Sequence, residues 1–339
     1  MVKHITTVTT TGYGGTGSSV ITDLLSEFNG VTSLGSTEYW FCQKPHGLSD
    51  LEFKLNDGRH RSYVAIAIEN FTKVMSEDKE LLNLLGKQHL EIILEDFISS
   101  LIDVHFRKKM SFEELGYVRG TYYYNIKPKF FQIISKVLGN IDEERCYRVP
   151  EKHRRYSRFD RIRFYKSART LTRNIFTENI DDSIKIVAVD QLVPVNNIDR
   201  YIPFFDNLVT YVIDRDPRDL FLLNKLRWKG ANYLCNTDDV VEFVDWFRAT
   251  REDVNRSLDK KTYFYNFEDF VYNYDRTVKE VVSNLNLSNL DHVYKKKIFD
   301  PEKSKQNTLL YQRSEALAYS TDLKLIEEKL TSYLWNQVG

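Results

Sequence analysis

The chain has 339 residues, 42% hydrophobic and 28% charged, which is enough for one large domain with a sizeable core. Lys plus Arg equal Asp plus Glu at 48 each, and this balance gives no reason to expect nucleic acid or a membrane as the main partner. The three widely spaced cysteines favour neither a disulfide framework nor a metal site, and the N-terminal residues lack the apolar core of a signal peptide. No apolar run approaches the ~20 residues of a membrane span. We therefore expect a cytoplasmic protein without a membrane span.

The first elements expected are a strand over residues 4–11, a glycine-rich loop, and a helix over residues 18–28. Residues 79–138 are expected to be mainly helical, with a capping box at Ser111-Phe-Glu-Glu114 and Pro128 at a first helical position. The helical period in this stretch is carried by Leu90, Leu94, Phe97, Leu101 and Val104.

Short apolar runs typical of buried parallel strands return at residues 184–189, 208–213 and 262–267. Helical patterns follow around residues 240–247, 278–285 and 323–333. Strands that alternate with helices predict an α/β fold with a parallel sheet covered on both faces. We expect one domain over residues 1–339, in which residues 60–175 form a mainly helical, basic insertion.

The glycine-rich loop Gly12-Tyr-Gly-Gly-Thr-Gly17-Ser18-Ser19 lies between the first strand and the first helix. Free backbone amides at such a junction, with glycines that allow close approach, favour an anion site. The loop satisfies GxGxxG through Gly12, Gly14 and Gly17, whereas Ser18 replaces the Lys of the nucleotide-phosphate pattern GxxxxGK[ST]. A tight turn with a serine cap is the simpler interpretation, and the segment alone does not decide between the two.

A second polar segment, Asp214-Arg215-Asp216-Pro217-Arg218-Asp219, follows the strand at 208–213. Asp216 and Pro217 suit the cap and first position of a helix. Arg215 is then expected at the carboxyl edge of the sheet, where open α/β sheets bind ligands and where an arginine can bind a phosphate through two hydrogen bonds. The alternative is a capped helix with surface ion pairs.

Together these segments resemble sulfotransferases that use 3′-phosphoadenosine-5′-phosphosulfate (PAPS). Thr16-Gly17-Ser18-Ser19 resembles their 5′-phosphosulfate loop, particularly that of carbohydrate sulfotransferases, and the strand with Arg215-Asp-Pro-Arg-Asp resembles their 3′-phosphate segment. Tyr263-Phe-Tyr-Asn-Phe-Glu268-Asp269-Phe270 is similar to their strand ending in Tyr-Glu-Asp-Leu, and Phe299-Asp-Pro-Glu-Lys-Ser304-Lys305-Gln-Asn307 to their late loop over the nucleotide. The resemblance covers roughly residues 1–40 and 184–335.

This resemblance implies a P-loop-type parallel sheet flanked by helices, PAPS as the donor and the desulfated nucleotide PAP as the product. Two positions depart from the family: Gly15 replaces a common Lys or Arg, and Leu223 replaces a Ser. Asn224, Ser304 or Lys305 would supply the missing hydrogen bond. The residues implied to bind the nucleotide are Gly14, Gly15, Thr16, Gly17, Ser18, Ser19, Arg215, Asn224, Ser304 and Lys305.

Glu38, 21 residues beyond Gly17, is the candidate general base, because heparan-type sulfotransferases place a catalytic Glu at similar spacing before an aromatic run. The aromatic residues at 39–41 are expected to desolvate this carboxyl partly and raise its pKa. A solvated surface Glu is the alternative, and His46 is the second candidate base.

Basic residues gather between Glu151 and Arg173, interleaved with aromatic ones. They form either a solvated helix face or an anion-binding wall for the nucleotide or an acidic glycan. The nine are Lys152, Arg154, Arg155, Arg158, Arg161, Arg163, Lys166, Arg169 and Arg173. By analogy with the family, a cytoplasmic chain with a carbohydrate-type loop favours a sugar hydroxyl as the acceptor, in a carbohydrate or a polysaccharide precursor. The insertion over residues 60–175 is then expected on the acceptor side.

Three other functions remain open at this point. A Rossmann oxidoreductase would use the same glycines for NAD(P) and Glu38 for the ribose, although its first strand is seldom so rich in Thr. A P-loop kinase would need a Lys at Ser18. A non-enzymatic glycan- or nucleic-acid-binding protein would rely on the basic aromatic segment and would not need the glycine loop.

Overall fold

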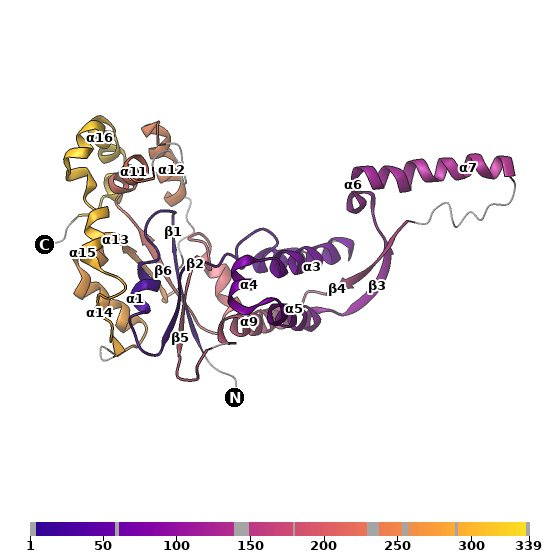
Figure 1. Cartoon of the computed structure of the whole chain (residues 1–339), viewed down its shortest axis with the longest axis horizontal. Coiled ribbons are helices and arrows are strands. Elements are labelled where there is room, and N and C mark those ends of the chain that lie inside the picture. The colour runs from indigo at the N-terminus through magenta and orange to yellow at the C-terminus, as the bar shows by residue number, and fades with distance from the viewer. Residues whose placement is uncertain are drawn as a thin grey trace.

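The computed structural model describes residues 5–57, 61–138, 149–178, 180–228, 237–252, 257, 259–288 and 291–336. Its centre is a five-stranded parallel sheet in the order β2-β5-β1-β6-β7 (Figure 1). The strands are β1 (Thr6–Gly12), β2 (Val31–Glu38), β5 (Ile186–Asp190), β6 (Leu208–Asp214) and β7 (Thr262–Asn266). The predicted α/β fold with a parallel sheet is therefore confirmed.

Alternate residues of the strands face two different helical layers, as the period of two in a strand requires. Ile186 and Ala188 of β5 pack in the cluster that contains α1 (Val20–Leu25), α13 (Phe267–Tyr272) and α14 (Tyr274–Asn284). Val187 and Val189 face the opposite layer. That layer is made of α2 (Leu48–Asn56), α3 (Arg61–Ser76), α4 (Lys79–Leu85), α5 (Lys87–Leu101), α9 (Arg161–Thr177), α10 (Ile198–Tyr201) and the 3-10 turn η2 (Ile202–Phe204).

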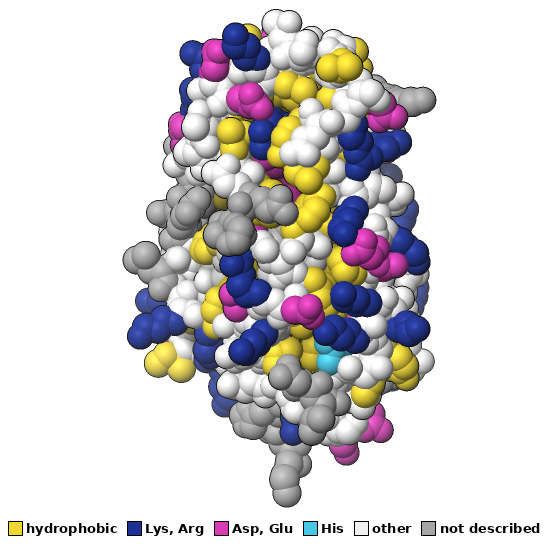
Figure 2. All heavy atoms as spheres, turned by 90° about the vertical axis from the view of Figure 1, so that its left-hand side faces the viewer, with side chains coloured by type: hydrophobic (Ala, Val, Ile, Leu, Met, Phe, Trp, Pro, Cys, Tyr) yellow, Lys and Arg dark blue, Asp and Glu magenta, His cyan; other side chains and the backbone are white. Residues whose placement is uncertain are grey.

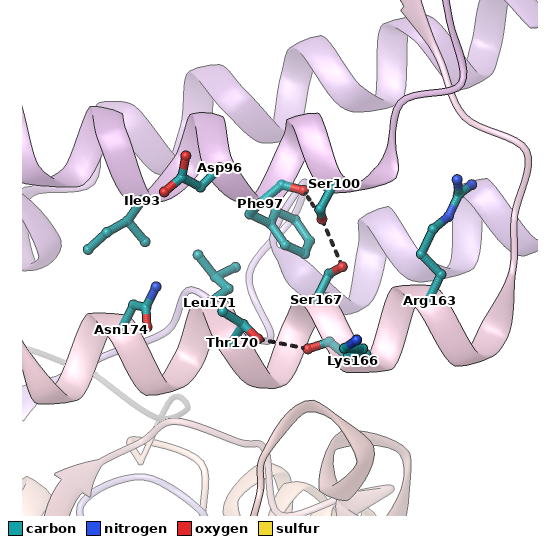
Figure 3. A pocket seen from close by; sticks show the side chains of 10 residues that line it. All are labelled: Ile93, Asp96, Phe97, Ser100, Arg163, Lys166, Ser167, Thr170, Leu171 and Asn174. Carbon is teal, nitrogen blue, oxygen red and sulfur yellow. Dashed lines mark hydrogen bonds between the residues drawn. The ribbon is translucent and has the colours of Figure 1, made fainter. Parts of the chain in front are cut away.

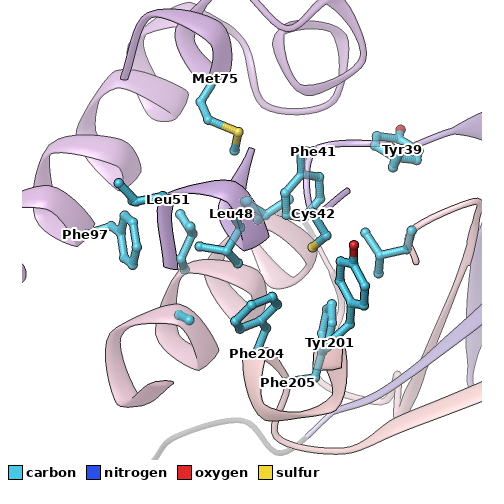
Figure 4. Packing of buried hydrophobic residues seen from close by; sticks show 14 of the residues in the cluster. Tyr39, Phe41, Cys42, Leu48, Leu51, Met75, Phe97, Tyr201, Phe204 and Phe205 are labelled. Carbon is cyan, nitrogen blue, oxygen red and sulfur yellow. The ribbon is translucent and has the colours of Figure 1, made fainter. Parts of the chain in front are cut away.

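The segment between β2 and β5 builds most of this second layer. Its buried side chains converge on Phe41, Cys42 and Leu48, which meet Tyr201 and Phe204 from beyond β5 (Figure 4). The helical part of residues 60–175 thus covers one face of the sheet.

A third group of helices lies beyond the end of β6. It consists of α11 (Pro217–Leu226), α12 (Val240–Glu252) and α16 (Ser320–Lys329), which share one hydrophobic cluster. Short elements complete this end: η5 (Leu310–Gln312), η6 (Ser314–Tyr319) and η7 (Thr331–Tyr333). They are preceded by α15 (Pro301–Ser304), which lies against α13, and by η4 (Lys305–Asn307). Among the described residues, no helix is both long and apolar enough to cross a bilayer.

A projecting arm interrupts the second layer. Strands β3 (Val104–Lys109) and β4 (Glu151–Tyr156) pair antiparallel and carry α6 (Phe112–Thr121), the π-helical turn η1 (Tyr122–Ile126) and α7 (Lys127–Leu138) away from the body (Figure 1). The capping box between Ser111 and Glu114 is confirmed.

Two expectations about this arm are wrong. The helix predicted to continue through Val104 ends at Leu101, and Val104 begins β3, because its partner Tyr156 lies 52 residues away and local periodicity cannot reveal such pairing. Pro128 does not open a helix, because it follows Lys127 in a helical run. The π turn directly before it accommodates the ring, which lacks an N–H and would clash with the preceding turn of a regular α-helix.

Candidate functional site

The glycine-rich loop lies at the carboxyl end of β1, next to the carboxyl end of β6. Gly14, Gly15 and Gly17 have φ of 89°, 63° and 85°, in the left-handed region that favours glycine. A Cβ at Gly17 would also lie 2.7 Å from the ring of Phe267. Backbone in this region is compatible with a concavity of successive amides, as predicted for an anion site.

The threonines of β1 hold the loop and the neighbouring strand end in place. The Thr10 hydroxyl donates to the Ser18 carbonyl at 2.7 Å, and the Thr11 hydroxyl donates to Gln191 Oε1 at 3.2 Å. The Gln191 amide donates in turn to Ser18 Oγ at 3.2 Å. The Thr-rich first strand, unusual for a buried position, therefore supplies hydroxyls to the site.

Two carboxylates stand at the ends of the adjacent strands β2 and β5. Glu38 and Asp190 are partners in the sheet register, and Ser18 Oγ donates to Asp190 Oδ1 at 3.3 Å. Burial raises the pKa of Asp190 to about 7, with a further contribution from the charge of Glu38, while the hydrogen bond from Ser18 opposes the shift. Asp190 thus titrates near neutral pH beside the loop.

Glu38 is not desolvated as expected. Its side chain is exposed and accepts a hydrogen bond from Trp40 Nε1 at 2.9 Å, and Trp40 is itself 49% exposed. The reason is that Tyr39 and Phe41 turn into the core, which leaves Glu38 and Trp40 together on the surface. The carboxylate is therefore accessible to a bound molecule.

Arg215 lies at the carboxyl end of β6 and is only 5% exposed. Its guanidinium stands 4.6 Å from the centre of the Phe267 ring, the ring that Gly17 also approaches. The guanidinium donates to the Asn307 carbonyl at 2.5 Å, while its Nε has no hydrogen-bond partner among the described residues. Phe267 thus joins the loop and this arginine into one site.

Buried acids surround Arg215. Burial raises the pKa of Glu268 to about 8 and that of Asp219 to about 6, although the charge of Arg215 opposes both shifts. Burial also lowers the pKa of Arg215, and the acids Glu268, Asp219 and Asp216 counter that effect. Burial therefore pushes both Arg215 and Glu268 toward their neutral forms, and the attraction between their charges opposes this.

The helix after Arg215 begins as predicted. Asp216 accepts a hydrogen bond from the Arg218 amide at 2.9 Å, and Pro217 is the first residue of α11. Asp219 on this helix accepts the amides of Leu309 and Leu310, each at 2.7 Å. These bonds hold residues 307–310, called the late segment below, against α11 and bring the Asn307 carbonyl to Arg215.

The other predicted nucleotide-binding residues lie apart from this centre. Lys305 pairs with Glu302 at 2.8 Å and lines a pocket of about 350 Å³ beside α13 and α14. Ser304 ends α15 directly before it. Asn224 is buried on α11, where its Nδ2 donates to the Leu220 carbonyl at 3.0 Å. Among the described residues, no hydrogen bond joins these three side chains to Arg215, and only the backbone of the late segment reaches it.

A polar pocket of about 380 Å³ adjoins the end of β5. Gln43, which lines it, donates through Nε2 to the Gln191 carbonyl at 2.6 Å. The pocket is further lined by Lys44, Pro45, Ser49, Asp50, Phe53 and Arg200. His46, the second candidate base, lies behind it, with Nδ1 3.1 Å from Lys54 Nζ and 3.6 Å from Asp50.

The basic segment is largely neutralised within the molecule. Five of its nine cations pair with carboxylates of the helical layer and the arm: Lys152 and Arg154 with Glu69, Arg154 also with Glu114, Arg155 with Glu95, Arg163 with Asp103, and Arg173 with Asp206. A pocket of about 370 Å³ between α5 and α9 includes Arg163 and Lys166, but none of its lining residues belongs to the loop or the strand ends (Figure 3). The opposite end of the molecule carries intermingled charges of both signs (Figure 2).

Sequence reasoning missed three contributors to this site: Asp190, Gln191 and Phe267. Asp190 directly follows a buried apolar strand, so the rule that identified Arg215 could have identified it. Phe267 carries no comparable signal, because its contact with both Gly17 and Arg215 depends on how β7 pairs with β6.

No family model matches the sequence, and no curated protein matches it. Among solved structures, the chain is similar to a sulfotransferase of Mycobacterium tuberculosis H37Rv, with 12% identity, coverage of 97% of this chain and 76% of that one, and a TM-score of 0.33. It is similar to the sulfotransferase domain of the curacin biosynthetic pathway (11% identity, 88% and 79% covered, TM-score 0.31). It is also similar to retinol dehydratase in complex with androsterone and PAP (10% identity, 89% and 66% covered, TM-score 0.30).

Proposed function

We propose that the chain is an enzyme that transfers the sulfuryl group of PAPS to a hydroxyl group of a carbohydrate acceptor. The observation that carries the proposal is the Phe267 ring, which Gly17 of the loop and the guanidinium of Arg215 both approach. The loop and Arg215, the two proposed anion-binding features, lie at the ends of the neighbouring strands β1 and β6. A donor with anionic groups at both its 5′ and 3′ positions matches such a pair.

The loop would hold the 5′-phosphosulfate. Its donors are the amides of Gly14, Gly15 and Gly17 and the hydroxyls of Ser18 and Ser19. Thr16 supports this assignment, because its hydroxyl is buried and without a hydrogen-bond partner among the described residues. A buried hydroxyl left unsatisfied is costly, and a ligand oxygen would remove that cost.

Arg215 would hold the 3′-phosphate. Its Nε is buried and unpartnered, so a phosphate oxygen would satisfy it through a charge-assisted hydrogen bond. Protonation of Glu268 reduces the repulsion that this phosphate would meet. Asn224, Ser304 and Lys305 remain proposed as further contacts, and they would need to reorient toward the nucleotide.

The transfer forms a bond between the acceptor oxygen and sulfur and breaks the bond between sulfur and the bridging phosphate oxygen, which leaves PAP. The acceptor proton must leave, and Glu38 is the proposed acceptor of that proton because it is exposed at the same sheet edge. The polar pocket that begins at Gln43 would hold the acceptor, since Phe53 offers a surface for a sugar ring and Ser49 and Asp50 offer hydrogen bonds.

The sheet order disfavours a Rossmann oxidoreductase. The dinucleotide fold places its second strand beside its first, whereas β5 separates β1 from β2 here. Glu38 is therefore two strands from the loop, which is too remote in the sheet for the ribose contact of that fold. A kinase is disfavoured because Ser18 occupies the position of the phosphate-binding Lys.

Calorimetric titration with PAP, NADH and ATP tests the proposal. We expect PAP to bind more tightly than the other two, and Arg215→Ala to weaken PAP by about 10- to 100-fold, in line with loss of a charge-assisted hydrogen bond. Adenosine 5′-phosphosulfate, which lacks the 3′-phosphate, should lose much less affinity. Arg107→Ala removes an exposed arginine on β3 of the arm and should change the affinity for neither ligand. Preference for NADH, or equal losses for PAP and adenosine 5′-phosphosulfate, would contradict the assignment.

A further inference from the structure

The last helix of the arm exposes an apolar stripe. Ile126, Phe130 and Ile133 are spaced by four and three residues, so they share one face, and their side chains are 55%, 58% and 64% exposed. Tyr117 and Val118, at the start of the same helical run, are 80% and 81% exposed. No other described helix or strand lies alongside α7 in Figure 1.

Such a helix needs a partner. Helices of about 12 residues are marginally stable in water unless an apolar face packs against something. A contiguous exposed apolar patch on a folded protein marks an interaction surface. The arm therefore ends in a surface that binds something outside the described part of the chain.

The charge of α7 and of the residues just before it indicates the kind of partner. Residues 115–138 contain no Asp or Glu but include Arg119, Lys127, Lys129 and Lys136, in a chain whose net charge is zero. Lys129 and Lys136 are exposed and lie four and three residues from Ile133, so they border the apolar stripe. A partner that complements this helix is both anionic and apolar.

The root of the arm is fixed to the body. Arg154 of β4 is only 3% exposed and pairs with Glu69 of α3 and with Glu114 of α6. The Glu114 carboxylate also accepts the Ser111 amide at 2.7 Å. These contacts anchor the base of the arm, while α7 projects beyond them.

We propose that α7 is an interfacial helix that binds the surface of an anionic lipid bilayer. Ile126, Phe130 and Ile133 would enter the boundary between headgroups and acyl chains, and the lysines beside them would contact lipid phosphates. A second copy of the chain is a poorer partner, because two α7 helices packed along the stripe would bring Lys129 and Lys136 of each copy together, and α7 itself contains no carboxylate to balance them. A nucleic acid could bind the lysines through its phosphates, but the apolar stripe would then stay exposed to water. This binding surface is separate from the proposed sulfuryl transfer.

The test is co-sedimentation of the full chain with vesicles of phosphatidylcholine, with and without phosphatidylglycerol. We expect binding to the anionic vesicles only. Lys129→Gln with Lys136→Gln should reduce the partition coefficient roughly 25-fold, since each cation near an anionic surface contributes about a factor of five. Phe130→Ser with Ile133→Ser should abolish binding to the anionic vesicles.

Matched controls lie on the body. Lys324→Gln with Lys329→Gln removes two exposed lysines of α16, and Val241→Ser with Leu317→Ser removes two exposed apolar side chains. Both control variants should bind like the original chain, and all four variants should keep the original thermal stability and affinity for PAP. Failure of the original chain to bind anionic vesicles, or equal losses in the control variants, would overturn the proposal. So would light scattering that shows a dimer which Phe130→Ser with Ile133→Ser dissociates, because the stripe would then belong to a second copy.

Discussion

At the scale of single residues, the two carboxylates at the ends of β2 and β5 have different environments and therefore suit different tasks. Asp190 is buried, hydrogen-bonded to Ser18 and titrates at about pH 7, so its charge acts directly on the loop. Glu38 is exposed beside Trp40 and is free to meet an acceptor. The two environments therefore support our proposal that Glu38 accepts the proton and that Asp190 positions Ser18.

Glu38→Gln tests this division of roles. The amide keeps the size of the side chain but cannot accept the acceptor proton, so kcat should fall on the order of 10²–10⁴-fold while PAP affinity stays unchanged. Steady-state turnover and calorimetry measure the two quantities separately. Glu280→Gln, at an exposed position on α14, is the control and should alter neither. Near-normal turnover in Glu38→Gln would remove Glu38 from the reaction, and lost PAP affinity would give it a nucleotide-binding role instead.

At the scale of elements, the sequence predicts those helices and strands whose position depends on the local pattern of residues. The strands β5, β6 and β7 were predictable because each is a short apolar run, and the positions of the loop and Arg215 followed from those strands. The first helix is shorter than predicted, Val20–Leu25 instead of residues 18–28. It stops early because the carboxylate of Glu27 accepts the amides of Lys296, Ile298 and Phe299, contacts that only the tertiary fold creates.

The same distinction applies to the site. The sequence indicated an anion loop and an arginine at strand ends, but it contained no signal for the ring that joins them. Phe267 meets both features because β7 pairs with β6 and so places α13 beside the loop. The exposure of Glu38 was also unpredictable, since it depends on Tyr39 and Phe41 turning into a core built by distant helices.

Gly17→Ala tests whether the close contact with Phe267 shapes the loop. Alanine is strained at φ 85°, and its Cβ would lie 2.7 Å from the ring. We therefore expect PAP binding to be lost and the free energy of unfolding to fall by about 1–3 kcal/mol. Gly35→Ala is the matched control, because Gly35 has φ 69° and open space around its Cβ. It should carry the backbone strain and leave PAP affinity intact. If both variants bind PAP normally, the contact with Phe267 does not shape the site.

At the scale of the whole molecule, buried acids gather at one edge of the sheet. Asp190, Asp219 and Glu268 have pKa values of about 7, 6 and 8, and burial is the largest cause in each case. Such groups cluster where function requires them, because a fold does not gain stability by burying acids that resist ionisation. Acids at the edge where the loop and Arg215 lie therefore make the free energy of unfolding depend on pH.

The direction of this pH dependence can be predicted for Glu268. Glu268 binds its proton in the folded chain up to about pH 8, but releases it near its ordinary pKa of 4.5 when the chain unfolds. Between these values the folded state holds more protons, so the free energy of unfolding must fall as pH rises from about 5 to about 8.

Glu268→Gln retains an oxygen to accept the Asp216 amide and cannot ionise. Its unfolding free energy, measured by chemical denaturation at both pH values, should fall less than that of the original chain, by on the order of a few kcal/mol. Glu280→Gln should keep the original slope. Parallel pH curves for Glu268→Gln and the original chain would mean that Glu268 is ionised in the folded state, and the carboxylate would then compete with a 3′-phosphate for Arg215.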